Sequence, residues 1–136
     1  DNLARKEINK LLLSNAGHEI KNKVRVFIPH ISVPDFSSMK DSFSYQDVMK
    51  EPKLYEGCFV RWKGRVSNVK VSEKEISFDF LVGYVDQRVL EGILRAHIEF
   101  SSKIDPAFAY EVIGKIILVD EKTIRLKITS LHELGV

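Results

Sequence analysis

The residues that could carry out chemistry are few and widely spaced. The seven glycines form neither a Gly-x-Gly-x-x-Gly nor a Walker A loop, and no Gly-x-Ser-x-Gly elbow is present. The single cysteine, Cys58, excludes an internal disulfide and a Cys-rich zinc module. Pairs such as Glu73/Glu75 and Asp120/Glu121 fall in predicted turns, where carboxylates are solvated rather than held in the cleft that acid–base catalysis needs. No His-x-x-x-His pair occurs among His18, His30, His97 and His132. The sequence therefore predicts a protein that is not an enzyme and holds no metal or cofactor.

Basic side chains on one side of alternating segments are the best candidates for a binding site. Within residues 58–66, Val60, Trp62 and Val66 alternate with basic residues, and this period of two predicts a strand with one apolar and one basic face. The same alternation predicts that Arg95 and His97 point outward from the third strand, and Arg125 and Lys127 from the last strand. The predicted ligand-binding residues are Arg61, Lys63, Arg65, Tyr84, Arg95 and His97.

These cations allow two interpretations. A single-stranded nucleic acid needs exposed aromatic rings for base stacking as well as cations along a groove. Only Tyr84 and Phe59 are candidate stacking residues, because Trp62 and the phenylalanines of the second strand fall on the apolar side. Asp79 and Glu99 would also interrupt the groove with negative charge. The other interpretation, which we prefer, is a solvated face that resists edge-to-edge aggregation.

Composition limits the class of protein. The chain has 136 residues, 44% of them hydrophobic and 29% charged, which fits one ordinary domain and excludes a disordered chain. No apolar run reaches 18 residues, so we expect no transmembrane segment. Residues 51–136 carry 13 basic and 13 acidic side chains, so they lack the net positive field that usually drives binding to polyanions.

The first third of the chain is expected to form an arm. Ala4, Ile8 and Leu11 are spaced as the apolar stripe of a helix over 1–16, which Gly17 would end. The stripe must be covered, and docking on this chain, self-association with a second copy and docking on a segment upstream of this sequence all stay open. A short strand is expected over 24–28, followed by a serine-rich linker. We place the boundary there, with an arm over 1–43 and a barrel domain over 44–136.

From residue 44 onward the pattern is mainly β. Ser44 would cap a short helix over 45–51 that Pro52 ends. Strands are expected over 58–66, 76–82, 93–100, 110–119 and 123–130, although residues 86–98 also fit a helix. Gly64 and Gly114 each lie inside the first strand of a hairpin, where a glycine marks a bend or a close backbone approach.

This pattern resembles a family of OB folds. Five strands arranged as a hairpin, a single strand and a hairpin suggest a Greek-key OB barrel. A local sequence also resembles the tRNA-anticodon-like and related OB domains of bacteria: Pro52-x-x-Tyr55-x-Gly57, leading into Val60-x-Trp62-x-Gly64-x-Val66. The resemblance covers about residues 44–130.

The resemblance implies a binding module in the bacterial cell envelope. Its partner would be a protein or a polymer, bound on the face of strands two and three. A single-stranded nucleic-acid binder is the alternative function, and a small enzyme with a dispersed site ranks third. Compartments other than the cell envelope, the cytoplasm among them, stay open.

Overall fold

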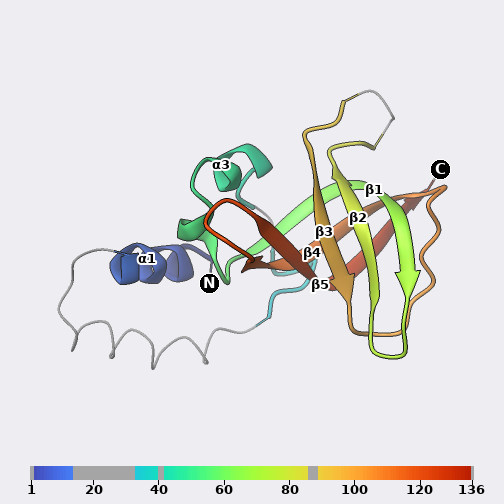
Figure 1. The fold of residues 1–136 in the computed structure, drawn as a ribbon, viewed down its shortest axis with the longest axis horizontal. Coiled ribbons are helices and arrows are strands. Elements are labelled where there is room, and N and C mark those ends of the chain that lie inside the picture. Colours follow the sequence, from blue (N-terminus) through green and yellow to red (C-terminus); the bar gives the residue numbers. More distant parts are fainter. Residues whose placement is uncertain (1, 14–32, 40–41, 86–88, 136) are drawn as a thin grey trace.

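A computed structural model describes residues 2–13, 33–39, 42–85 and 89–135. Five strands close into a barrel in the order β1-β2-β3-β5-β4, which confirms the predicted OB-like fold (Figure 1). All neighbouring strands are antiparallel except β3 and β5. The elements are α1 (Asn2–Leu13), α3 (Tyr45–Lys50), the 3₁₀ helix η2 (Pro52–Tyr55), β1 (Phe59–Val71), β2 (Ile76–Val82), β3 (Gly92–Ile98), β4 (Ala109–Leu118) and β5 (Ile124–Gly135).

The alternation of the sequence determines which side chains fill the barrel. Trp62, Phe78 and Phe80 are buried in one cluster with aliphatic residues from all five strands, as the pattern predicted. Residues 92–98 form a strand, so the helical alternative for this part is wrong. Residues 86–88 of that alternative lie outside the described residues. Two strands, β1 and β5, extend beyond their predicted C-terminal ends. In β1, a bulge after Ser67 lets the pairing with β2 resume at Lys70.

Gly64 is a point of close backbone approach, as its place inside a strand suggested. A Cβ at this position would lie 2.1 Å from the carbonyl oxygen of Leu81 on β2. Only a residue without a side chain lets β1 bend against β2 here. The strand pairing of β4 and β5 is irregular at Gly114, the corresponding glycine of the other hairpin.

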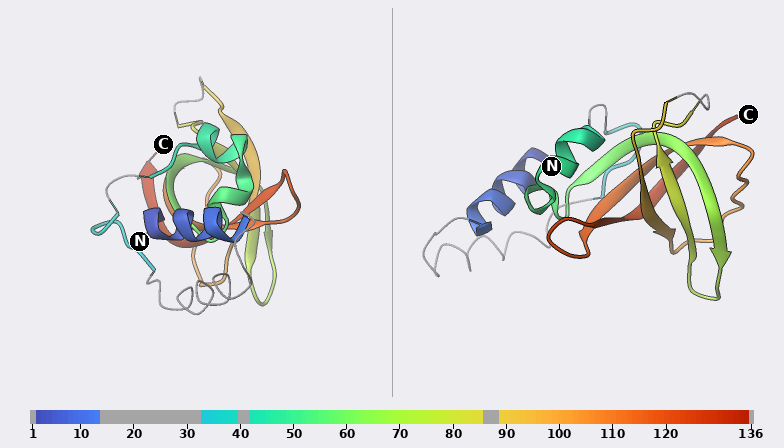
Figure 2. Two further views of the ribbon diagram at one scale, coloured as in Figure 1. Left: turned by 90° about the vertical axis from the view of Figure 1, so that its left-hand side faces the viewer. Right: turned by 45° about the horizontal axis from the view of Figure 1, so that its top comes forward.

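The short helices and α1 lie across one end of the barrel (Figure 2). Ser44 caps α3 by accepting a hydrogen bond from the backbone NH of Asp47, as predicted. Pro52 opens η2, and Tyr55 is buried among the core residues. Gly57 then turns the chain into β1 with φ +77°, which explains the spacing of these residues.

The helix α1 docks on its own chain, and two asparagines make specific contacts there. Asn9, only 4% exposed, donates to the carbonyl oxygens of Leu54 (3.0 Å) and Glu56 (2.5 Å). The side chain of Asn2 bonds both the NH and the carbonyl of Phe59, as a neighbouring strand would. Of the arrangements that the sequence left open, docking on this chain is thus present. It uses polar contacts that the apolar stripe did not reveal.

Part of the expected linker also packs on the barrel. Met39 is buried with Phe59 and Ile113, and Phe36 packs against them. Phe59 is thus not the exposed aromatic that the sequence suggested. The expected strand over 24–28 and the end of the first helix lie outside the described residues.

Candidate functional site

The outward face of β2 and β3 is partly exposed, with Ile93 and Arg95 exposed on β3 and Ser77, Asp79 and Leu81 half-buried on β2. Register places these side chains in pairs across the two strands: Ser77 opposite His97, Asp79 opposite Arg95, and Leu81 opposite Ile93. On the far side of β3, the first residues of β5 continue the same face, with Arg95 opposite Arg125 and His97 opposite Lys127.

Two of the predicted binding residues on β1 are occupied by internal contacts. Arg61 donates to the carbonyl oxygens of Phe36 (3.0 Å) and Met39 (2.6 Å) and pairs with Glu111 at 3.0 Å. Its guanidinium also lies 5.1 Å from the centre of the Phe36 ring. Arg61 therefore holds the segment over 33–39 against β1.

Arg65 is also structural, and it is 7% exposed. It donates to the carbonyl oxygens of Val85 (3.2 Å) and Ala107 (2.9 Å), which joins the β2–β3 and β3–β4 loops to β1. Lys63 is exposed, whereas Tyr84 is half-buried in the loop after β2. The structure thus brings Arg65 and the Tyr84–Val85 loop to one end of the face.

Arg95 and His97 lie together on β3. Arg95 pairs with Asp79 at 2.7 Å. The pKa of Asp79 is lowered, first by a hydrogen bond from Asn68 and then by Arg95, so this pair is ionised at neutral pH. His97 is 7% exposed and lines a pocket.

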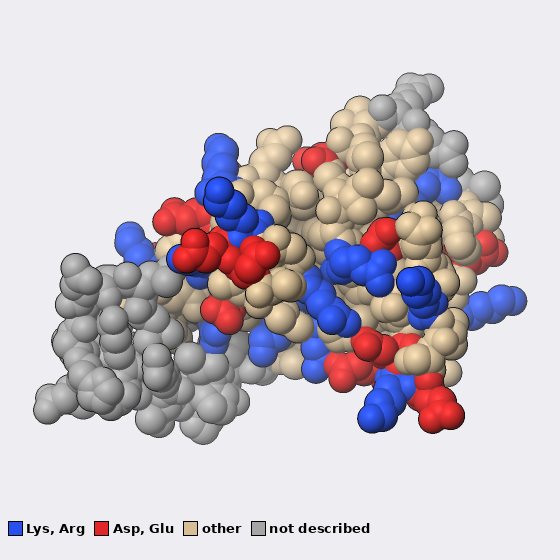
Figure 3. All heavy atoms as spheres, viewed as in Figure 1, with Lys and Arg blue, Asp and Glu red and all other residues tan. Residues whose placement is uncertain are grey.

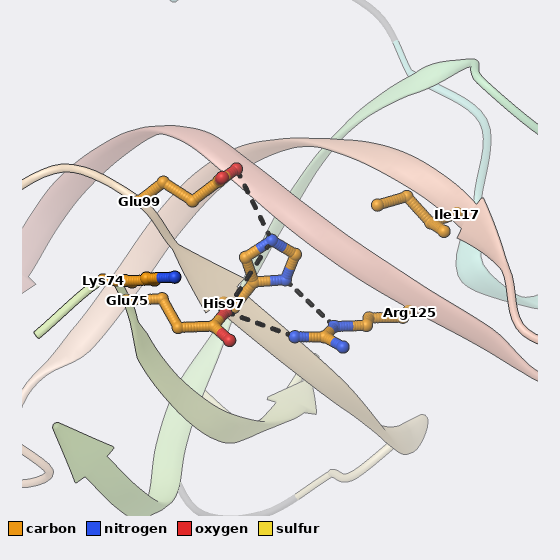
Figure 4. Close-up of a pocket in the computed structure, with 6 residues that line it drawn as sticks. All are labelled: Lys74, Glu75, His97, Glu99, Ile117 and Arg125. Atoms are coloured by element: carbon orange, nitrogen blue, oxygen red, sulfur yellow. Dashed lines mark hydrogen bonds and ion pairs between the residues drawn. The ribbon is translucent and has the colours of Figure 1, made fainter. Parts of the chain in front are cut away.

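The pocket has a volume of about 320 Å³ and lies where the β1–β2 turn, the end of β3 and the start of β5 meet (Figure 4). Arg125 crosses it: Nε donates to His97 Nδ1 at 3.0 Å, and a terminal nitrogen pairs with Glu75 at 3.3 Å. The residues that line it are Lys74, Glu75, His97, Glu99, Ile117 and Arg125.

The contact with Arg125 determines the protonation of His97. A guanidinium nitrogen can only donate, so Nδ1 of His97 must accept and the proton of the neutral ring lies on Nε2. Burial, and then the charge of Arg125, lower the pKa of His97 below its usual value, and Glu75 and Glu99 oppose this shift only partly. His97 is therefore a neutral hydrogen-bond donor at neutral pH.

Carboxylates accompany the cations of this face. Lys127 binds Glu99 at 2.9 Å, and that hydrogen bond lowers the pKa of Glu99. Figure 3 shows Lys and Arg side chains interspersed with Asp and Glu over the described part of the molecule in this view. Glu75, expected to be a solvated turn residue, is half-buried and paired with Arg125, a contact between distant segments that the sequence did not reveal.

This site offers hydrogen-bond donors and acceptors to a ligand. No group of three or more His, Cys, Asp or Glu is arranged to hold a metal ion in the described ranges. None of the helices in these ranges is long and apolar enough to cross a membrane.

Comparisons with known proteins match two parts of the chain. A family model described as the Spirochaete C-terminal OB fold matches residues 37–132, and one described as a domain of unknown function (DUF8514) matches residues 1–28. Curated proteins gave no match.

Solved structures match at low sequence identity. A protein described as a putative aspartyl-tRNA synthetase from Leishmania major Friedlin matches with a TM-score of 0.50 and 14% identity, over 84% of this chain and 25% of that one. The aspartyl-tRNA synthetase of Entamoeba histolytica matches with a TM-score of 0.54 and 13% identity, over 79% and 24%. The mitochondrial single-stranded DNA-binding protein Rim1 of S. cerevisiae matches with a TM-score of 0.45 and 8% identity, over 59% and 96%. The chain thus spans about a quarter of each synthetase, and the likeness to them concerns the fold.

Proposed function

The chain belongs to the Spirochaete C-terminal OB fold family, and from this we propose that it is a non-catalytic module that binds a protein partner. The partner would lie on the outward face of β2 and β3, where OB folds hold their ligands. The cell envelope, suggested by the resemblance alone, stays a prediction of where this occurs.

The observation that supports a protein partner is the composition of this face. Its six outward positions on β2 and β3 hold no Phe, Tyr or Trp, so it offers no stacking platform for bases. Three of the cations on and beside it are already paired with carboxylates, which a phosphate backbone would have to displace.

Exposed aliphatic side chains lie at one end of the same face. Ile93 is 56% exposed on the outward side of β3, beside the half-buried Leu81, and Val89 and Leu90 just before the strand are exposed as well. An apolar patch next to charged pairs is typical of a protein interface.

Photocrosslinking tests this proposal. A photoreactive residue at Leu90 should give a discrete protein adduct in extracts of the cells that make the protein, and Ile93→Asp should abolish the adduct. The same group at Leu3, which is also exposed but lies on α1 at the end of the barrel, is the matched control.

Two results would refute a protein partner on this face. One is an adduct that Ile93→Asp leaves unchanged. The other is binding of single-stranded DNA or RNA at about micromolar affinity that falls steeply with salt, since this dependence is typical of phosphate contacts.

A further inference from the structure

The pocket beside His97 contains a hydrogen-bond donor that has no close acceptor among the described residues. The proton on Nε2 points toward two carboxylates, but the nearest oxygen of Glu99 is 3.7 Å away and that of Glu75 is 4.0 Å away. Both distances are too long for a hydrogen bond. Within the described part of the chain, Nε2 therefore has only these two distant carboxylates beside it, and since no buried side-chain nitrogen or oxygen there lacks a hydrogen-bond partner, it faces the solvent in the pocket.

The guanidinium of Arg125 is only loosely held by its own carboxylate. Its pair with Glu75 is a contact at 3.3 Å, longer than the roughly 2.7–2.9 Å that is usual for charge-assisted bonds. Both side chains are more than a third exposed. A second carboxylate could therefore take over Arg125 while Glu75, on the β1–β2 turn, moves into solvent.

Charge around the pocket favours one more anion. Arg95 stands directly opposite Arg125 across β3 and β5, and Lys115 stands opposite Lys127 across β4 and β5. Like charges in facing positions destabilise a sheet. The lining itself is balanced, with Lys74 and Arg125 against Glu75 and Glu99, and the neighbouring register positions add Arg95, Lys115 and Lys127 against Asp79.

We infer that this pocket receives a carboxylate side chain of the bound protein partner, which accepts hydrogen bonds from His97 Nε2 and Arg125. The inference rests on the proposed function and names the chemistry of its anchor. A carboxylate suits the site better than a phosphodiester strand does. A strand would bring further phosphates against Glu75, Glu99 and Asp79, whereas a single acidic side chain can enter between them.

Peptide titration tests the pocket without the natural partner. The probes are acetyl-Leu-Glu-Leu-amide, its Gln counterpart and inorganic phosphate, followed through the side-chain nitrogen signals of His97 and Arg125 by NMR. The Glu peptide should shift both signals with a dissociation constant of about 1 mM, and the Gln peptide should bind at least about tenfold more weakly because it accepts no charge-assisted bond.

Three variants separate the pocket from the general field of the surface. Arg125→Gln should weaken binding of the Glu peptide about tenfold, since a partly exposed charge-assisted bond is lost. Glu75→Gln should strengthen it several-fold, because the competing carboxylate is gone. Arg95→Gln, the matched control, removes the same charge from the same face but does not line the pocket, so it should change binding about twofold or less.

Three outcomes would overturn the inference. They are equal binding of the Glu and Gln peptides, equal effects of Arg125→Gln and Arg95→Gln, and phosphate that binds at His97 more tightly than the Glu peptide. The proposed function fails separately. If the photoadduct at Leu90 survives Arg125→Gln unchanged, the partner exists but does not use this pocket. If the wild-type adduct is missing, the proposed function itself is wrong.

Discussion

Removal of one asparagine should release the helix α1 from the barrel without unfolding the barrel. Asn9 lies almost fully buried between α1 and the η2–β1 junction, where its amide serves two backbone carbonyls. Asn9→Ala loses both hydrogen bonds, at about 1 kcal/mol each. Alanine is the better helix former by up to about 0.7 kcal/mol, so the net loss of docking free energy is about 1–2 kcal/mol.

Cys58 provides the assay for this prediction. Its thiol is fully buried, with Sγ 3.7 Å from the carbonyl oxygen of Asn2 at the start of α1. Burial raises the pKa of Cys58 to about 11, so an alkylating reagent should modify it only through opened states. A loss of about 1–2 kcal/mol should raise the labelling rate about 5- to 30-fold.

The control is Lys10→Ala, which places alanine at an exposed position of the same helix and should leave the rate unchanged. A denaturant titration of each variant measures global stability in parallel. If Cys58 in Asn9→Ala is labelled no faster than in the wild type, Asn9 does not hold α1 in place. If the labelling rate rises only in proportion to the loss of global stability, α1 leaves only when the barrel unfolds.

Two further predictions concern the barrel and its pocket. Gly64→Ala should lower the free energy of unfolding by about 3 kcal/mol or more, because its Cβ would collide with the carbonyl of Leu81, and a denaturant titration that finds less than about 1 kcal/mol would contradict this. His97 has a pKa below its ordinary 6.5 in the folded state, so its contribution to stability is complete above about pH 6.5 and is lost as pH falls below that value. Melting temperatures should therefore decline less from about pH 7.5 to about pH 5 in His97→Gln than in the wild type, and parallel declines would show that His97 does not carry this dependence.

The strands could be predicted from the sequence because burial imposes a period of two on a barrel. Each strand has one face toward the core, so the alternation alone was enough to place Trp62, Phe78 and Phe80 inside. Gly64 was also informative, because a glycine that interrupts the alternation inside a strand indicates a bend or a close backbone approach.

The contacts of the arginines could not be predicted, because alternation gives the side of the sheet and not the partner. Arg61 and Arg65 lie on the side opposite the apolar residues of β1, as expected, but both donate to backbone carbonyls of other segments. A carbonyl is offered by every residue, so such a contact leaves no signature in the sequence. The same reason applies to Asn2 and Asn9 of α1, whose acceptors are carbonyls of the η2–β1 junction and of β1.

The segments before the barrel also explain why the β2–β3 face is the available one. The helix α1, with α3 and η2, covers one end of the barrel, and the residues over 33–39 cover part of the outside of β1 and β4 through Met39 and Arg61. The hydrogen bonds and the hydrophobic cluster described above for these segments involve η2, the η2–β1 junction, β1 and β4. The cations that the sequence placed on β1 are therefore partly used to attach the arm, whereas those on β3 and β5 stay beside a pocket that is open to a ligand. A binding partner would meet Ile93 and Arg125 on a barrel whose β1–β4 side is partly covered, and variants at these two positions should affect binding more than any variant of Arg61 that still folds.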